Sequence, residues 1–195
     1  MTEEENLTLK ICLLGDNAVG KSSLLIKYAY DIFDDSYLPT LGMKVAKKKI
    51  SLEIPGHERK FNITFWIYDT MGGAHFRGLL NRSNLGGLSG AFLVCDVTRP
   101  ETLENLIFWV DSLYRECDGN IPIIYCANKS DLTGGQIFDL ADKENLTEVF
   151  NAPWLLTSAR TGDNIDEAFR ILATKMIKIH LQEKGSHLPL NSESQ

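Results

Sequence analysis

The segment Gly15-Asp16-Asn17-Ala18-Val19-Gly20-Lys21-Ser22 decides the fold, because it matches the phosphate-binding loop pattern G-x-x-x-x-G-K-[ST] at every typed position. The apolar run 9–14 before it is typical of a strand, and residues 23–28 after it are typical of a helix start. Backbone N–H groups in such a loop, helped by the positive end of the following helix, wrap a phosphate. The sequence therefore predicts a nucleotide site in which Lys21 reaches the β- and γ-phosphates and the Ser22 hydroxyl holds Mg²⁺.

Length and composition limit the other possibilities. The 195 residues, 44% of them hydrophobic, are enough for one buried core, and a formal charge of −6 offers no basic surface for nucleic acid. No run approaches the roughly 18 apolar residues of a membrane span, and the start of the chain is acidic where a signal peptide is basic. We expect a cytoplasmic protein with an acidic tail (1–7), one nucleotide-binding domain (8–183) and a polar tail (184–195).

The apolar runs predict an α/β fold. They recur near residues 8–14, 43–54, 60–68, 90–96, 121–127 and 153–157, with helical patterns between most of them. This alternation is typical of a doubly wound, mostly parallel six-stranded sheet with helices on both faces. The second and third runs are separated only by the turn signal at 54–58, which makes them an antiparallel hairpin at a sheet edge. Three lysines at 47–49 fit a charged, solvated edge strand.

Other side chains are expected to serve the core. An apolar stripe through the last helix is typical of a core-packing face; its members are Ile165, Ala168, Phe169, Leu172, Met176 and Ile179. The four cysteines have no C-x-x-C spacing, so we expect reduced thiols, buried where they lie inside strand-like runs (Cys12, Cys95 and Cys126), with Cys117 near a helix end.

Two further segments predict which base is bound. Asn128-Lys129-Ser130-Asp131 directly follows the run 121–127, at the strand end where open α/β sheets bind ligands. The Asp131 carboxylate can accept two hydrogen bonds from guanine, at N1–H and the N2 amine, whereas adenine would leave this charged acceptor unpaired. Ser158-Ala159-Arg160 follows the last strand and completes the site, with the Ala159 N–H facing guanine O6. The sequence therefore predicts a guanine nucleotide.

With these motifs the chain resembles the Ras superfamily of small GTPases from about residue 8 to 181, and its Rab and Ras branches more than its Arf branch. The resemblance also rests on segments 37–42 (Tyr-Leu-Pro-Thr-Leu-Gly), 69–72 (Asp-Thr-Met-Gly) and 161–169. It implies the small G-protein fold of the P-loop NTPases and a GTPase switch between GDP and GTP. It also implies a monomer that works with effectors, exchange factors and GTPase-activating proteins.

The resemblance assigns roles to the remaining site residues. It makes Thr40 a Mg²⁺ ligand and γ-phosphate sensor, with Asp69 holding the ion through water. Phe33 then packs against guanine, Tyr37 closes over the phosphates, and the Gly72 N–H contacts the γ-phosphate. The implied metal set is Ser22, Thr40 and Asp69, and the implied catalytic set is Lys21, Thr40 and Gly72. The implied nucleotide-binding set is Asn17, Ala18, Val19, Gly20, Lys21, Ser22, Ser23, Phe33, Tyr37, Pro39, Thr40, Gly72, Asn128, Lys129, Asp131, Ser158, Ala159 and Arg160.

One departure from the family bears on catalysis. Gly73 stands where the family has its water-positioning glutamine, and a glycine has no side chain with which to orient the attacking water. We therefore expect slow intrinsic hydrolysis of GTP. A partner that inserts both an arginine and a glutamine, or His75 swinging inward, would complete the reaction. Asn17 occupies a loop position that is glycine in the Ras branch and polar in many Rabs, so it is Rab-like.

Lipid anchoring and the class of function complete the expectations. The last cysteine is Cys126 and residue 2 is Thr, so neither prenylation nor myristoylation is expected for this sequence. Three explanations stay open: membrane recruitment through a protein partner, a truncated chain, or a lineage without prenylated GTPases. Two functions remain open: a GTPase switch with slow hydrolysis, and a hydrolysis-deficient module that stays loaded with GTP. The intact Mg²⁺ and phosphate residues favour the first, and Gly73 favours the second. Asp131 disfavours an ATP-dependent phosphotransferase.

Overall fold

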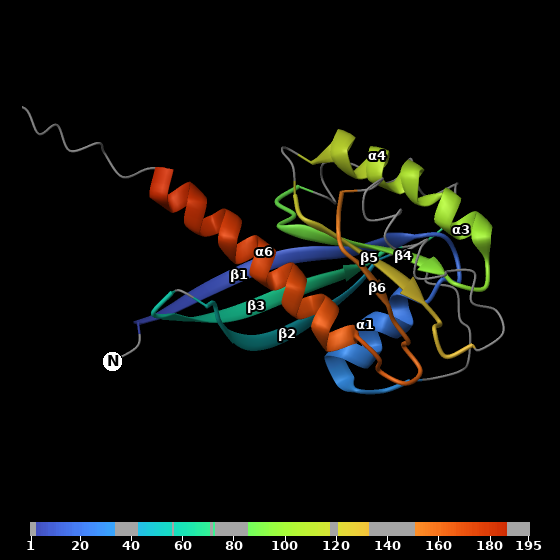
Figure 1. Cartoon of the computed structure of the whole chain (residues 1–195), viewed down its shortest axis with the longest axis horizontal. Helices are drawn as coiled ribbons and strands as arrows, with labels where there is room; N and C mark the ends of the chain where they lie inside the picture. The colour runs from blue at the N-terminus through green and yellow to red at the C-terminus, as the bar shows by residue number, and fades with distance from the viewer. Residues whose placement is uncertain are drawn as a thin grey trace, which may run out of the picture.

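The computed structural model describes residues 3–33, 43–55, 57–70, 72, 86–117, 121–132 and 151–186. Within these residues, six strands form one sheet in the order β2-β3-β1-β4-β5-β6 (Figure 1). The β2–β3 pair is antiparallel and the other neighbouring pairs are parallel. The predicted mostly parallel α/β sheet with an antiparallel edge strand is confirmed.

The strands and helices overlap the runs that predicted them. The strands are β1 (Glu3–Gly15), β2 (Lys44–Glu53), β3 (Arg59–Asp69), β4 (Gly90–Asp96), β5 (Ile123–Asn128) and β6 (Trp154–Leu156). The described helices are α1 (Lys21–Tyr30), α3 (Pro100–Glu104), α4 (Leu106–Glu116) and α6 (Ile165–Ser186).

Side-chain alternation along the strands builds one apolar layer on each face of the sheet. Ile11 and Leu13 of β1 belong to the layer that α1 and α6 cover, where Phe169 of α6 stacks on Tyr28 of α1 with ring centroids 3.5 Å apart. Cys12 and Leu14 belong to the opposite layer, which α4 covers (Figure 1). Helices therefore cover both faces of the sheet, as predicted.

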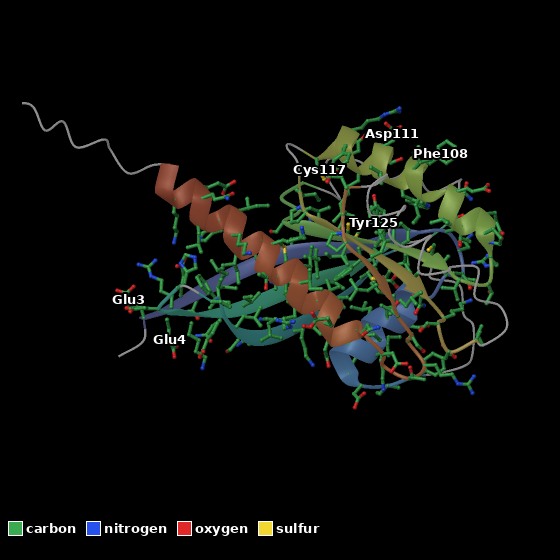
Figure 2. All side chains as sticks on the ribbon, viewed as in Figure 1. Glu3, Glu4, Phe108, Asp111, Cys117 and Tyr125 are labelled. Atoms are coloured by element: carbon green, nitrogen blue, oxygen red, sulfur yellow. The ribbon has the colours of Figure 1, made fainter. Side chains whose placement is uncertain are left out.

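Helix α4 shows the same division between a core face and an outer face. Its Trp109 is fully buried, whereas Phe108 is 52% exposed. Figure 2 shows Phe108 and Asp111 on the outer side of this helix, with Tyr125 of β5 inside the molecule. The Tyr125 ring stacks on Trp154 with centroids 4.5 Å apart, which ties β5 to the short edge strand β6.

The start of the chain differs from its prediction. Strand β1 begins at Glu3, so residues 3–7, which the sequence pattern assigned to an acidic tail, pair in parallel with residues 59–63 of β3. Arg59 donates to Glu3 Oε2 at 2.8 Å and Asn62 donates to Glu4 Oε2 at 3.0 Å. These contacts join the two glutamates to side chains of β3 at the surface of the sheet.

The third glutamate, Glu5, binds the last helix. Its Oε1 lies 2.9 Å from His180 Nε2 and 2.5 Å from Lys184 Nζ. Helix α6 accordingly continues to Ser186, past the predicted domain boundary at residue 183. The N-terminal strand and the C-terminal helix are thus joined through one carboxylate.

The lysines of the edge strand and the cysteines lie as predicted, whereas in the apolar stripe of α6 Ile177 is fully buried and Ile179 only partly buried. Lys47 and Lys49 are exposed on edge strand β2, and Lys47 Nζ lies 5.1 Å from the centre of the Trp66 ring. All four cysteines are free thiols, and burial raises the pKa of Cys126 to about 12, so it stays protonated. Among the described helices, none is both long and apolar enough to cross a membrane.

Candidate functional site

The loop between β1 and α1 requires both glycines of its motif. Gly15 has φ +143° and Gly20 has φ +98°. A Cβ at Gly15 would lie 2.2 Å from the Val94 carbonyl oxygen, and one at Gly20 would lie 2.2 Å from Asn128 Nδ2. Both positions therefore need glycine, because β4 and the end of β5 pack against the loop backbone with no space for a Cβ, and both φ angles are positive.

Lys21 is the first residue of α1, and its ammonium points back into this loop. Its Nζ donates to the carbonyl oxygens of Gly15 at 2.9 Å and Asp16 at 2.8 Å, and the residue is only 6% exposed. Burial lowers the pKa of Lys21 to about 8, although the carboxylates of Asp69 and Asp16 oppose that shift. Phosphate charges in the loop would raise it again, so the site favours an anionic ligand.

The next residue, Ser22, meets an acidic side chain from β3. Its hydroxyl donates to Asp69 Oδ2 at 2.5 Å, and Asp69, the last residue of β3, is fully buried. Thr70 donates its hydroxyl to the Leu13 carbonyl at 2.8 Å, which fixes the chain where it leaves the strand. A hydroxyl and a carboxylate side by side fit Mg²⁺, which prefers hard oxygen ligands. Thr40, the third expected ligand, lies outside the described residues.

Gly72 brings the segment after β3 against the phosphate loop. The residue is buried, and a Cβ built on it would lie 2.5 Å from the Asp16 carbonyl oxygen and 2.6 Å from Lys21 Nζ. The backbone of Gly72 therefore leaves no room for a side chain beside the loop, which suits an N–H expected to contact the γ-phosphate. Five other residues named above lie outside the described part of the chain: Tyr37, Pro39, Met71, Gly73 and His75.

The two predicted base-reading segments meet at the ends of β5 and β6. Asn128 accepts the Ala159 N–H on its Oδ1 at 3.2 Å and donates from Nδ2 to the Val19 carbonyl at 2.8 Å. Ser158 donates its hydroxyl to Asp131 Oδ1 at 2.6 Å. These contacts hold the base-reading segments together and join them to the phosphate loop.

For several other predicted site residues, the surroundings do not by themselves indicate a contact with the nucleotide. Asn17 and Ala18 are exposed at the tip of the loop, and Ala18 has φ +59°. Phe33 is half-buried against the core layer under α1 and α6, and Arg160 is exposed. The Ala159 N–H, which we expected to face guanine O6, donates to Asn128 here, so a guanine would share or replace that contact.

Sequence reasoning missed the contacts that hold the phosphate loop from the other side. Asp16, an untyped position of the motif, accepts hydrogen bonds from Asn105 Nδ2 at 2.6 Å and Trp109 Nε1 at 3.0 Å. Local periodicity carries no signal for these contacts, because it indicates which face of an element is apolar and not which polar group a side chain meets.

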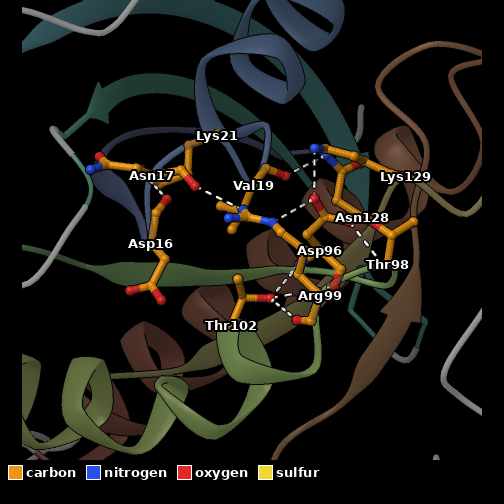
Figure 3. Close-up of polar contacts among 10 residues, drawn as sticks. All are labelled: Asp16, Asn17, Val19, Lys21, Asp96, Thr98, Arg99, Thr102, Asn128 and Lys129. Carbon is orange, nitrogen blue, oxygen red and sulfur yellow. Dashed lines mark hydrogen bonds and ion pairs between the residues drawn. The ribbon is translucent and has the colours of Figure 1, made fainter. Parts of the chain in front are cut away.

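A second missed cluster surrounds Asp96 at the end of β4. Its Oδ2 lies 2.6 Å from Lys129 Nζ and 3.1 Å from Arg99 Nε, and Arg99 Nη2 donates to the Asn17 carbonyl at 2.8 Å (Figure 3). Burial alone would raise the pKa of Asp96, but hydrogen bonds from Lys129 and Thr98 hold it below its usual range. The carboxylate is therefore ionised at neutral pH.

The fold and the site together define a class of protein. A phosphate-loop motif after the first strand, an acidic residue at the end of β3 and the segments predicted to read guanine after β5 and β6 are the parts expected of a P-loop GTP-binding protein. A model of the Ras family matches residues 10–178. The chain belongs to the Ras family, and it is a GTP-binding small GTPase.

Proposed function

We propose that this small GTPase is a switch that hydrolyses GTP slowly and recruits effectors in its GTP state. The contact of Gly72 with the phosphate loop carries the proposal. This contact supports an arrangement in which Gly72, near the start of the segment after β3, detects the γ-phosphate. The next residue, Gly73, has no side chain to orient the attacking water. The segment therefore keeps its contact with the γ-phosphate, whereas hydrolysis of GTP is slow.

Different residues of the site bind the phosphates, the base and the Mg²⁺ ion. Lys21 offsets the negative charge of the β- and γ-phosphates. Asp131 reads the base, and the Ser158 hydroxyl fixes the Asp131 carboxylate. Ser22 and Asp69, with Thr40, would hold Mg²⁺. The ion would neutralise phosphate charge when it is bound.

The proposal also covers the location of the protein, its oligomeric state and its regulators. We place it in the cytoplasm as a monomer. The polar residue Asn17 in the phosphate loop supports a place in the Rab-like part of the family. Slow hydrolysis makes it dependent on a GTPase-activating protein to return to the GDP state, and on an exchange factor to leave it.

Single-turnover hydrolysis tests the catalytic part. We expect slow release of phosphate by the wild type, a faster rate in Gly73→Gln with little change in GTP affinity, and no change in His75→Ala. A wild type that hydrolyses quickly and loses its activity in His75→Ala would overturn the proposal and make the histidine catalytic.

Hydrogen exchange separates the switch from the alternative, a GTP-loaded interaction module that Gly73 also favours. In a switch, segments 33–42 and 70–82 exchange more slowly with a non-hydrolysable GTP analogue than with GDP, because the γ-phosphate contacts them. Equal exchange in both states, together with GTP as the nucleotide that co-purifies, would favour the module.

A further inference from the structure

A buried acid lies between the two halves of the nucleotide site. Asp96 is the last residue of β4, it is aligned with Asn128 at the end of β5, and it is 1% exposed. Its Oδ1 accepts from the Thr98 N–H at 2.9 Å and the Thr98 hydroxyl at 2.7 Å. Its Oδ2 forms ion pairs with Lys129 and Arg99. Both oxygens of the carboxylate are thus held in fixed directions.

Arg99 extends this cluster to the phosphate loop. Its Nε lies 3.1 Å from Asp96 Oδ2, and its Nη2 donates to the Asn17 carbonyl at 2.8 Å. The backbone beneath it is also fixed, because the buried Thr102 hydroxyl donates to the Arg99 carbonyl at 2.7 Å and accepts the Asp96 N–H at 3.0 Å. Two different nitrogens of one guanidinium therefore bridge Asp96 and the loop (Figure 3).

Lys129 extends the cluster to the base-reading segment. It lies between Asn128 and Asp131, has φ +67°, and places Nζ 2.6 Å from Asp96 Oδ2. We propose that Asp96 and Arg99 are positioning residues: they couple the base-reading segment to the phosphate loop, and this coupling slows the release of the bound guanine nucleotide.

Charge and burial favour a role in the site over a role in the fold alone. The acid is buried, whereas its two cations are about a third exposed, at 33% for the Lys129 side chain and 36% for that of Arg99. A buried acid with its charge partners is weak evidence for stability, because well-packed apolar residues stabilise a core as well or better. Arg99 instead also reaches the Asn17 carbonyl of the phosphate loop, and Lys129 itself belongs to the base-reading segment 128–131.

Release of a fluorescent GDP tests the coupling. The protein is loaded with N-methylanthraniloyl-GDP in Mg²⁺ buffer and chased with excess GDP. We expect Arg99→Ala to release the nucleotide about fivefold faster or more, because it loses charge-assisted contacts at a partly exposed site. Arg170→Ala is the matched control, since Arg170 forms the same kind of i,i+3 pair with Glu167 on the surface of α6. An unchanged release rate in Arg99→Ala would overturn the proposal.

Two further variants separate positioning from charge and from general stability. Arg99→Lys keeps the charge without the two-nitrogen bridge, so it should not restore slow release; full restoration would overturn the bridging role. Lys129→Ala should accelerate release less in the Arg99→Ala background than in the wild type, because both cations act through Asp96. Additive effects would contradict the coupling, and thermal unfolding with GDP bound shows whether a variant is simply less stable.

Discussion

The side-chain amide of Asn128 donates to the carbonyl of Val19 at 2.8 Å, and this buried contact joins the end of β5 to the phosphate loop. The neighbouring Gly20 leaves no room for a Cβ beside the same amide. On its other side, Asn128 accepts the N–H of Ala159. Because the three segments pack on one side chain, a change in one of them is expected to alter the nucleotide contacts of the others.

Replacing Lys21 with Ala should lower GDP affinity about a hundredfold or more. The variant removes a buried cation that would face several phosphate charges of a bound nucleotide, where water is partly excluded. Calorimetric titration measures the loss, with Lys178→Ala as the control because Lys178 is exposed on α6. Equal GDP affinity in the two variants would contradict the placement of the phosphates.

Asp131→Asn should shift base preference from guanine towards xanthine. Ser158 donates to Oδ1 of Asp131, so an asparagine is expected to keep its oxygen towards Ser158 and to turn its NH₂ group towards the base. That donor conflicts with the N2 amine of guanine and suits the carbonyl of xanthine. A competition assay between GDP and xanthosine diphosphate measures the shift; a variant that keeps its guanine preference would show that Asp131 does not read the base.

Gly72→Ala should weaken GTP about tenfold more than GDP, a difference of about 1.4 kcal/mol. The added Cβ would meet the Asp16 carbonyl oxygen at 2.5 Å, so the segment must move away from the loop and from the γ-phosphate. Gly87→Ala is the control: nothing lies within 4 Å of its Cβ, and its φ of +72° costs about 1 kcal/mol of stability without touching the site. An unchanged ratio of GTP to GDP affinity in Gly72→Ala would exclude the proposed contact.

The contact of Glu5 with α6 should make stability depend on pH. Hydrogen bonds from Lys184 and then His180 hold the pKa of Glu5 below its usual 4.5, with Arg59 also within 3.6 Å. A lowered pKa stabilises the folded chain at pH values above 4.5, and this contribution is lost as the pH falls through the lower folded value.

Thermal unfolding at a series of pH values measures this contribution. Glu5→Gln should lower the unfolding temperature near pH 6, and the difference from the wild type should disappear on acidification. Making both chains in a His180→Gln background leaves Lys184 and Arg59 as the charged partners of residue 5 in the comparison. A difference that persists below the folded pKa would assign the effect to packing and not to charge.

The sequence alone determined the parts of this protein that depend on neighbouring residues. The spacing of Gly15, Gly20, Lys21 and Ser22 defines a phosphate loop wherever a strand precedes it and a helix follows. The alternation of apolar runs predicts a doubly wound sheet, and the short turn at 54–58 leaves only a hairpin for β2 and β3. The residues proposed to read guanine could also be named, because their chemistry and their place after a strand are both visible in one short segment.

Only the tertiary structure decided the contacts between residues that lie far apart in the chain. Asp16 and Trp109 are 93 positions apart, and no local pattern pairs an untyped loop residue with a core indole. The same holds for Arg99 and the Asn17 carbonyl, 82 positions apart, and for Glu5 and His180, 175 positions apart. Acidic residues 3–5 are typical of a tail when read alone, and they belong to β1, where β3 and α6 bring basic and amide partners to them. Such pairs form because sheet order and register bring polar groups from distant parts of the chain within hydrogen-bond distance.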